Sequence, residues 1–137
     1  MIKKAKVDWL EGYRLEGHTD NCKTVLMDTG EHATAASPAQ LLLQSLAGCT
    51  MMDCVLIFTK ARKHLKKFNV DIEAEEVEAI PRIYKKIHLK YNIESDDLNP
   101  EDVKRAIELS EEKYCRVHAM LDGKVELTSS FILNGKN

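Results

Sequence analysis

Alternating apolar and charged side chains mark the first strand of the chain. Residues 4–10 show a period of two, which predicts a strand with one solvated face. Glycines bracket residues 13–16, and residues 22–28 mix β-branched and apolar side chains before the next glycine. We therefore expect an N-terminal meander of three short strands.

A helix is predicted to follow, from residue 38 to about residue 66. Ser37 can cap its first turn, Pro38 suits the first helical position, and Gln40 can complete a capping box. No charged residue occurs from Ala33 to Met52, and the apolar side chains point in every direction around the helical wheel. The pattern predicts a helix that is buried on all sides.

A membrane span is the competing interpretation of this apolar stretch. Polar residues interrupt the run and Asp53 ends it, so it falls short of the roughly 20 mostly apolar residues that a span requires. A soluble core helix is favoured. One small sheet covers only one side of such a helix, and we expect a symmetric homodimer whose central helices pack together between the sheets.

The second half is predicted to hold three strands and two helices. In chain order these are a strand over 68–75, a strand over 83–93, a helix from Asn99 towards Tyr114, a short helix over 117–121 and a strand over 125–133. The first two strands form a hairpin that turns near Pro81, and the longer helix breaks at Tyr114–Cys115. This order predicts an α+β fold with antiparallel sheets in one domain over 1–137.

Composition and charge exclude several classes of function. The 137 residues carry 20 Lys and Arg against 22 Asp and Glu, a net charge of −2, which offers no basic surface for nucleic acid. No apolar segment follows the basic N-terminus as in a signal peptide, which predicts a cytoplasmic protein. The five histidines and four cysteines lack metal-ligand spacing, so no metal is expected.

The cysteines are the candidate chemical groups. Cys49 faces an apolar side of the helix with Asp53 one turn further on, and it is either a buried packing residue or a reactive thiol. It lies too far from the helix start for the terminal dipole to favour a thiolate, so an activating cation is required. Cys115, next to Arg116 and near His118, occupies a setting that favours a thiolate. Cys54 and Cys22 are expected to be packing residues.

Asp53 itself has two interpretations. The simpler is a helix residue that is hydrogen-bonded at the end of the buried stretch, because an unpaired buried charge is costly. The alternative is a residue that positions a cation near Cys49.

Three segments of the chain form a distinctive set: Ser37-Pro38-Ala39-Gln40-Leu41-Leu42, Leu46-Ala47-Gly48-Cys49-Thr50-Met51-Met52-Asp53 and Leu109-Ser110-Glu111-Glu112-Lys113-Tyr114-Cys115. In these segments the chain closely resembles the OsmC/Ohr family, the osmotically induced and organic-hydroperoxide-resistance proteins. The similarity covers nearly the whole chain in order and spacing, and it looks closest to the OsmC-like branch. It implies an intertwined α+β homodimer with central helices between two sheets and sites at the subunit interface.

The resemblance also implies roles for the two thiols. Cys49 attacks the peroxide oxygen and becomes a sulfenic acid, and Cys115 resolves it as a disulfide that an external dithiol protein reduces. No metal, flavin or haem is required. An apolar pocket around Cys49 suits an alkyl or lipid hydroperoxide better than hydrogen peroxide.

The chain departs from the family pattern at the residues that activate the first cysteine. The peroxidase branches use an arginine from an N-terminal strand, held by a glutamate directly after the proline of the helix start. Ala39 occupies that glutamate position here, and Arg14 matches the arginine by its place between two early strands.

Three functions are therefore weighed. The first is a thiol peroxidase for organic hydroperoxides, with Cys49, Cys115 and Arg14 as catalytic residues. The second is a non-catalytic homodimer that binds a small apolar ligand at the subunit interface, which Ala39 favours. The third is other thiol chemistry, on persulfides or acyl groups.

Overall fold

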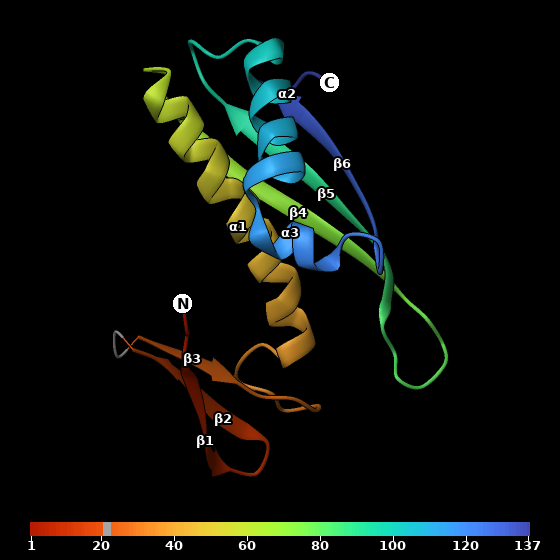
Figure 1. Ribbon diagram of the computed structural model, residues 1–137. Helices are drawn as coiled ribbons and strands as arrows, with labels where there is room; N and C mark the ends of the chain where they lie inside the picture. The colour runs from red at the N-terminus through yellow and green to blue at the C-terminus, as the bar shows by residue number, and fades with distance from the viewer. Residues whose placement is uncertain (21–22) are drawn as a thin grey trace. The chain divides into compact units, whose positions relative to one another are not determined.

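The computed structural model describes residues 1–20 and 23–137, and the chain forms two compact units, Met1–Leu42 and Leu43–Asn137 (Figure 1). The strands of the N-terminal unit are β1 (Ala5–Glu11), β2 (Arg14–Thr19) and β3 (Thr24–Met27), which pair antiparallel in that order. The predicted meander is confirmed. Cys22 lies outside the described residues.

The helix α1 (Pro38–Lys60) starts where the sequence predicts. The Gln40 backbone N–H donates to Ser37 Oγ at 3.2 Å, and the Ser37 N–H donates to Gln40 Oε1 at 2.9 Å. These two bonds form the predicted capping box and satisfy backbone donors that the first helical turn leaves without partners.

The predicted end of this helix near residue 66 is wrong, because the chain leaves the helix at Lys60. Arg62 adopts a left-handed φ of 59°, its N–H donates to Thr59 O, and the Lys63 N–H donates to Phe58 O. This is the pattern of a Schellman motif, which closes the last carbonyls of a helix. The basic residues after Lys60 belong to the following loop and strand.

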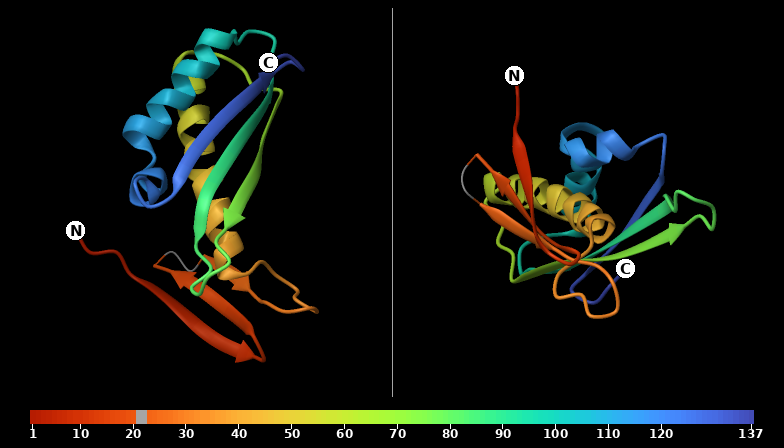
Figure 2. Two further views of the ribbon diagram at one scale, coloured as in Figure 1. Left: turned by 90° about the vertical axis from the view of Figure 1, so that its right-hand side faces the viewer. Right: turned by 90° about the horizontal axis from the view of Figure 1, so that it is seen from below.

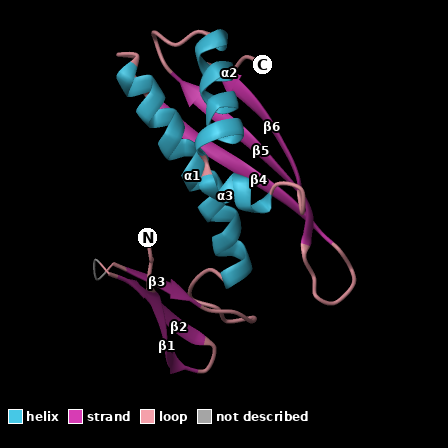
Figure 3. Cartoon of the chain, viewed as in Figure 1, coloured by secondary structure: helices cyan, strands magenta, loops and turns pink. Residues whose placement is uncertain are grey.

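The C-terminal unit packs helices on a second three-stranded sheet (Figures 2 and 3). Its strands and helices are β4 (Lys67–Glu76), β5 (Tyr84–Glu94), α2 (Pro100–Leu109), the π-helix η1 (Ser110–Tyr114), α3 (Arg116–Leu121) and β6 (Glu126–Leu133). The predicted hairpin is confirmed, and so are the helix break before Cys115 and the short helix after it. Asn99 caps α2 in a capping box with Asp102.

One strand pairing differs from the prediction. β4 and β5 are antiparallel, but β6 runs parallel to β5, with Lys86 opposite Glu126 and Ile93 opposite Leu133. The three helical segments between β5 and β6 carry the chain back to the start of β5, and this crossover makes a parallel pair. The second sheet is therefore mixed, not antiparallel.

The hydrophobic core of this unit lies between the helices and one face of the sheet. Its buried side chains come mainly from α1, β5 and α2: Leu46, Ala47, Cys54, Phe58, Ile87, Leu89, Tyr91, Ile93, Val103, Ala106 and Ile107. The four residues of β5 in this set alternate along the strand, as a strand with one buried face requires.

One side of α1 is not covered within a single chain. Met52, Val55 and Leu56 are 75%, 42% and 53% exposed, so the expectation of a helix buried on all sides is not met by one copy. The sequence argument for a second copy rests on this shortage of covering surface. The homodimer itself stays a prediction.

By length and composition alone, α1 could also cross a membrane, contrary to the length argument from the sequence. The core helix of a soluble protein meets the same criterion, and α1 contributes five buried residues. This property therefore carries no assignment to a membrane.

Asp97 joins the loop after β5 to the loop after α1. Its Oδ1 accepts from the His64 backbone N–H at 2.9 Å and from Ser95 Oγ at 3.0 Å, and its Oδ2 lies 2.9 Å from His64 Nδ1. These bonds, the His64 backbone N–H first among them, lower the pKa of the Asp97 carboxyl to about 2.

We expect Asp97→Asn to lower the free energy of unfolding at pH 7. Because the folded-state pKa lies below that of the unfolded chain, about 3.9, the stabilisation is present above pH 4 and is lost as the pH falls from 4 to 2. Urea unfolding at pH 7, 4 and 2.5 measures the difference. Asp96→Asn, at an exposed ion pair with Lys66, is the control with a small effect. A difference that does not change with pH would contradict this account.

Candidate active site

Helix α1 places Cys49 and Asp53 on one face, because residues four apart lie one turn above each other. Both side chains are half-buried. The capped and well-packed helix therefore presents a thiol and a carboxylate side by side at the surface of the core.

The π-helix η1 brings Cys115 to the same place. Its wider turn is closed by a 2.7 Å bond from the Cys115 N–H to Ser110 O, five residues back. Cys115 then leaves the helix in an extended conformation and caps α3, where its Sγ accepts from the His118 N–H at 3.3 Å.

The three side chains form a compact cluster. The sulfur atoms of Cys49 and Cys115 and a carboxylate oxygen of Asp53 all lie within 4.8 Å of one another, and we call this set the thiol–carboxylate cluster. Ser110 Oγ donates to Asp53 Oδ2 at 2.9 Å. This bond agrees with the simpler interpretation of Asp53 as a hydrogen-bonded helix residue, and its role in positioning a cation stays a prediction.

The prediction that Cys115 lies in a setting that favours a thiolate is wrong. Burial raises the pKa of the Cys115 thiol to about 12, and a hydrogen bond with Cys49 adds to this, while the His118 backbone N–H opposes it. Its side chain is 2% exposed. The charged neighbours in the sequence do not compensate for the loss of water around the sulfur.

Cys54 is a packing residue, as predicted. It is fully buried in the core, and burial followed by the charge of Asp53 raises its pKa to about 12. The prediction for Cys22 falls outside the described residues.

Arg14 is the first residue of β2, and its guanidinium donates to Glu11 Oε1 at 3.2 Å. Its charge also helps to lower the pKa of Asp28, after the backbone N–H groups of Thr34 and Thr29. Arg14 belongs to the N-terminal unit and Cys49 to the C-terminal unit. Its role at the thiol therefore stays a prediction.

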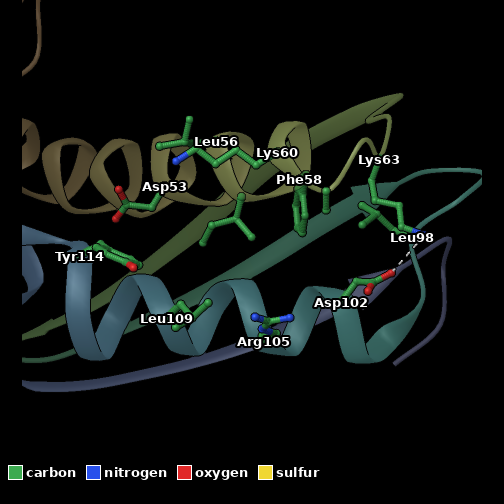
Figure 4. Close-up of a pocket in the computed structure, with 12 residues that line it drawn as sticks. Asp53, Leu56, Phe58, Lys60, Lys63, Leu98, Asp102, Arg105, Leu109 and Tyr114 are labelled. Carbon is green, nitrogen blue, oxygen red and sulfur yellow. Dashed lines mark ion pairs between the residues drawn. The ribbon is translucent and has the colours of Figure 1, made fainter.

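A groove of about 570 Å³ runs between α1 and α2 and has Asp53 in its wall (Figure 4). Its lining is mostly apolar, with Leu56, Ile57, Phe58, Ala61, Leu98, Leu109 and Tyr114, and it also contains Lys60, Lys63, Asp102 and Arg105. Figure 4 shows Asp53 and Tyr114 at one end, and the Lys63–Asp102 ion pair at the other. Asp53 is the member of the thiol–carboxylate cluster that lines this groove, so an apolar ligand bound there would lie beside Asp53.

The chain matches the model of the family described as OsmC-like protein over residues 30–130. It is 34% identical over 128 residues to protein YhfA of Escherichia coli K12, covering 93% of this chain and 96% of that protein. This chain is a member of the OsmC family.

Solved structures show the same fold. An OsmC-like protein from Mycoplasma pneumoniae superimposes with a TM-score of 0.82 at 17% identity, covering 97% of both chains. The organic hydroperoxide resistance protein OhrB of Bacillus subtilis gives a TM-score of 0.63 at 17% identity, covering 94% of this chain and 98% of that one. The predicted α+β OsmC-like fold is confirmed.

The contribution of Ser110 was not predicted from the sequence. Ser110 is fully buried and donates a hydrogen bond to the Asp53 carboxylate. In the sequence, however, nothing distinguishes it from a small residue that only packs in a helix. The available signal was the spacing of Cys49 and Asp53, which implies a carboxylate beside the thiol that needs a donor.

We expect Ser110→Ala to lower the free energy of unfolding by about 1–3 kcal/mol, because it removes a buried hydrogen bond to a carboxylate. In a double-mutant cycle with Asp53→Asn, the two effects should be non-additive by about 0.5 kcal/mol or more. Urea unfolding of the four proteins provides the measurement. Ser130→Ala combined with Asp53→Asn is the control and should be additive. Additivity of Ser110→Ala and Asp53→Asn would show that the bond contributes nothing.

Proposed function

We propose that this protein is a thiol-dependent peroxidase of the OsmC type, which reduces organic hydroperoxides. The Cys49 thiolate attacks the peroxide oxygen, so that the O–O bond breaks, Cys49 becomes a sulfenic acid, and the alkoxide leaves and takes up a proton to form an alcohol. The Cys115 sulfur then attacks the Cys49 sulfur and releases water. A dithiol reductant protein restores both thiols and leaves as its own disulfide.

The observation that carries this proposal is the closeness of the two thiols. Their sulfur atoms lie within 4.8 Å of each other, although one comes from α1 and the other follows η1. A disulfide needs an S–S distance of about 2.05 Å, which rotation of the two side chains together with a small backbone adjustment would provide. Such a pair suits reversible oxidation.

Their different environments support the assignment of roles. Cys49 is half-buried and is the more open of the two to a peroxide, whereas Cys115 is 2% exposed. Burial raises the pKa of the Cys115 thiol, so in the reduced protein Cys115 is poorly suited to attack a peroxide itself, and the first attack is assigned to Cys49.

The groove between α1 and α2 supports an organic rather than an inorganic peroxide. Its apolar walls favour a hydrocarbon chain, and Asp53 belongs to both the groove and the thiol–carboxylate cluster. The name of the Bacillus subtilis protein with the same fold, organic hydroperoxide resistance protein, points to the same class of compound.

The proposal includes Arg14 as the cation that activates Cys49, and a cytoplasmic homodimer as the working form. Ala39 stands where the peroxidase branches carry the glutamate that holds the arginine. In this chain Glu11 is the carboxylate that contacts Arg14, and it would have to supply that support.

We expect cumene hydroperoxide to convert the reduced protein to a Cys49–Cys115 disulfide within one turnover, and faster than hydrogen peroxide does. Intact mass and thiol trapping, in the presence of a metal chelator, follow the reaction. Cys49→Ser should abolish oxidation, whereas Cys115→Ser should stop at a trappable sulfenic acid on Cys49.

Cys54→Ala is the matched control, because Cys54 lies on the same helix but packs in the core, and it should form the same disulfide. Unchanged oxidation in Cys49→Ser, or wild-type oxidation no faster than that of a free thiol, would contradict the peroxidase. The second result would favour the non-catalytic apolar-ligand protein, which native mass spectrometry would reveal as a retained small molecule.

Arg14→Ala should slow the oxidation of Cys49 about tenfold, because a charge that stabilises the reacting thiolate by about 1.4 kcal/mol changes its population tenfold. Arg14→Lys should recover part of the rate, since it keeps the charge but loses the planar fork. Arg82→Ala, at an exposed position of the β4–β5 loop, is the control. The rate of sulfenic acid formation under pseudo-first-order peroxide is measured. Equal rates in Arg14→Ala and the control would remove Arg14 from the site.

A further inference from the structure

We propose that the reduced thiol–carboxylate cluster binds one zinc-like divalent cation, ligated by Cys49, Asp53 and Cys115. Among residues 1–20 and 23–137, this is the group of Cys, His, Asp and Glu side chains whose ligand atoms lie close enough together to hold an ion. The inference does not rest on the proposed peroxidase activity, because it concerns the reduced protein without peroxide.

The donor set suits zinc better than magnesium or calcium. Zn²⁺ takes thiolate sulfur and carboxylate oxygen in tetrahedral sites, whereas the hard cations take oxygen ligands alone. Three protein ligands leave a fourth position for water or a small molecule, as in catalytic zinc sites. The arrangement therefore predicts an open site.

The spacing of the ligand atoms is close to what zinc needs. Two sulfur atoms at about 2.3 Å from a tetrahedral ion are about 3.8 Å apart, and the atoms of the cluster all lie within 4.8 Å of one another. To bind zinc, the ligand atoms would have to move towards one another by about 1 Å or less. Two ligands one turn apart on a helix, with a third from another segment, form a common framework for zinc.

The atoms around the ligands also fit a metal site. Ser110 Oγ donates to Asp53, and the His118 backbone N–H donates to the Cys115 sulfur. Such outer hydrogen bonds orient the ligands of a metal site. Both donors are in place before any ion binds.

Asp53 belongs both to the cluster and to the groove wall (Figure 4), so the groove is the side from which an ion would approach Asp53. Zn²⁺ binds thiolates, so a proton that either sulfur still carries is released when the ion binds. A disulfide has no thiolate to offer, and oxidation of Cys49 and Cys115 therefore excludes the ion.

Titration of the anaerobic, reduced and chelator-treated full chain with Co²⁺ tests this proposal, since thiolate–cobalt charge-transfer absorption reports on each bound sulfur. We expect saturation at one Co²⁺ per chain and bleaching by Zn²⁺, which binds such sites more tightly than cobalt. Cys49→Ser and Cys115→Ser should each lose about half of the absorption or more. Asp53→Asn should weaken affinity about tenfold or more.

Two control variants should behave like the wild type. Cys54→Ala removes a thiol on the same helix outside the cluster, and Glu108→Gln removes an exposed carboxylate of α2. Absence of the absorption in the wild type, or its full retention in either cysteine variant, would overturn the site. Because the titration contains no peroxide and the oxidation experiment contains chelator, failure of one does not imply failure of the other.

Discussion

The hydrogen bond from Ser110 to Asp53 joins the two segments on which the site depends. It connects the first residue of the π-helix η1 to α1, five residues before Cys115 and one helical turn after Cys49, and so helps to hold the two thiols near each other. Burying a carboxylate beside two sulfur atoms without a hydrogen-bond donor costs free energy of folding. The bond from Ser110 lowers this cost. The two helices that the bond connects are held in place by the mixed sheet of the C-terminal unit.

The mixed sheet provides this support. β6 returns parallel to β5 only because α2, η1 and α3 cross over between them, and the same crossover lays η1 against α1. Glu111, the second residue of η1, accepts hydrogen bonds from Tyr91 of β5 and Ser129 of β6. The π-helix is therefore held by α1 through Ser110 and by the sheet through Glu111.

Local signals in the sequence predicted much of the fold. The helix starts were predicted from the capping residues Ser37 and Asn99, and the hairpin from the alternation along β4 and β5. Both features depend on residues that are close together in the sequence. The helix end at Lys60 escaped prediction, since Arg62 rather than glycine takes the left-handed position. The direction of β6 escaped it too, because strand pairing is decided by contacts distant in sequence.

In the candidate site, too, the sequence identified the residues but not the properties that depend on contacts between distant parts of the chain. The resemblance identified Cys49 and Cys115, and the structure brings their thiols together, but the protonation of Cys115 depends on burial that its neighbours Arg116 and His118 do not reveal. Spacing rules consider residues near one another in the sequence. They therefore do not detect this cluster, whose side chains come from α1 and from the end of η1.

The π-helix also suggests how such a site could arise during evolution. A π turn holds one more residue than an α turn, so η1 is equivalent to an α-helix that has gained a single residue. Each residue rotates the following chain by about 100° around the helix axis. Loss of that residue would leave the helix intact and turn Cys115 away from Cys49. The position of Cys115 beside Cys49 thus depends on the number of residues in η1 as well as on its side chains.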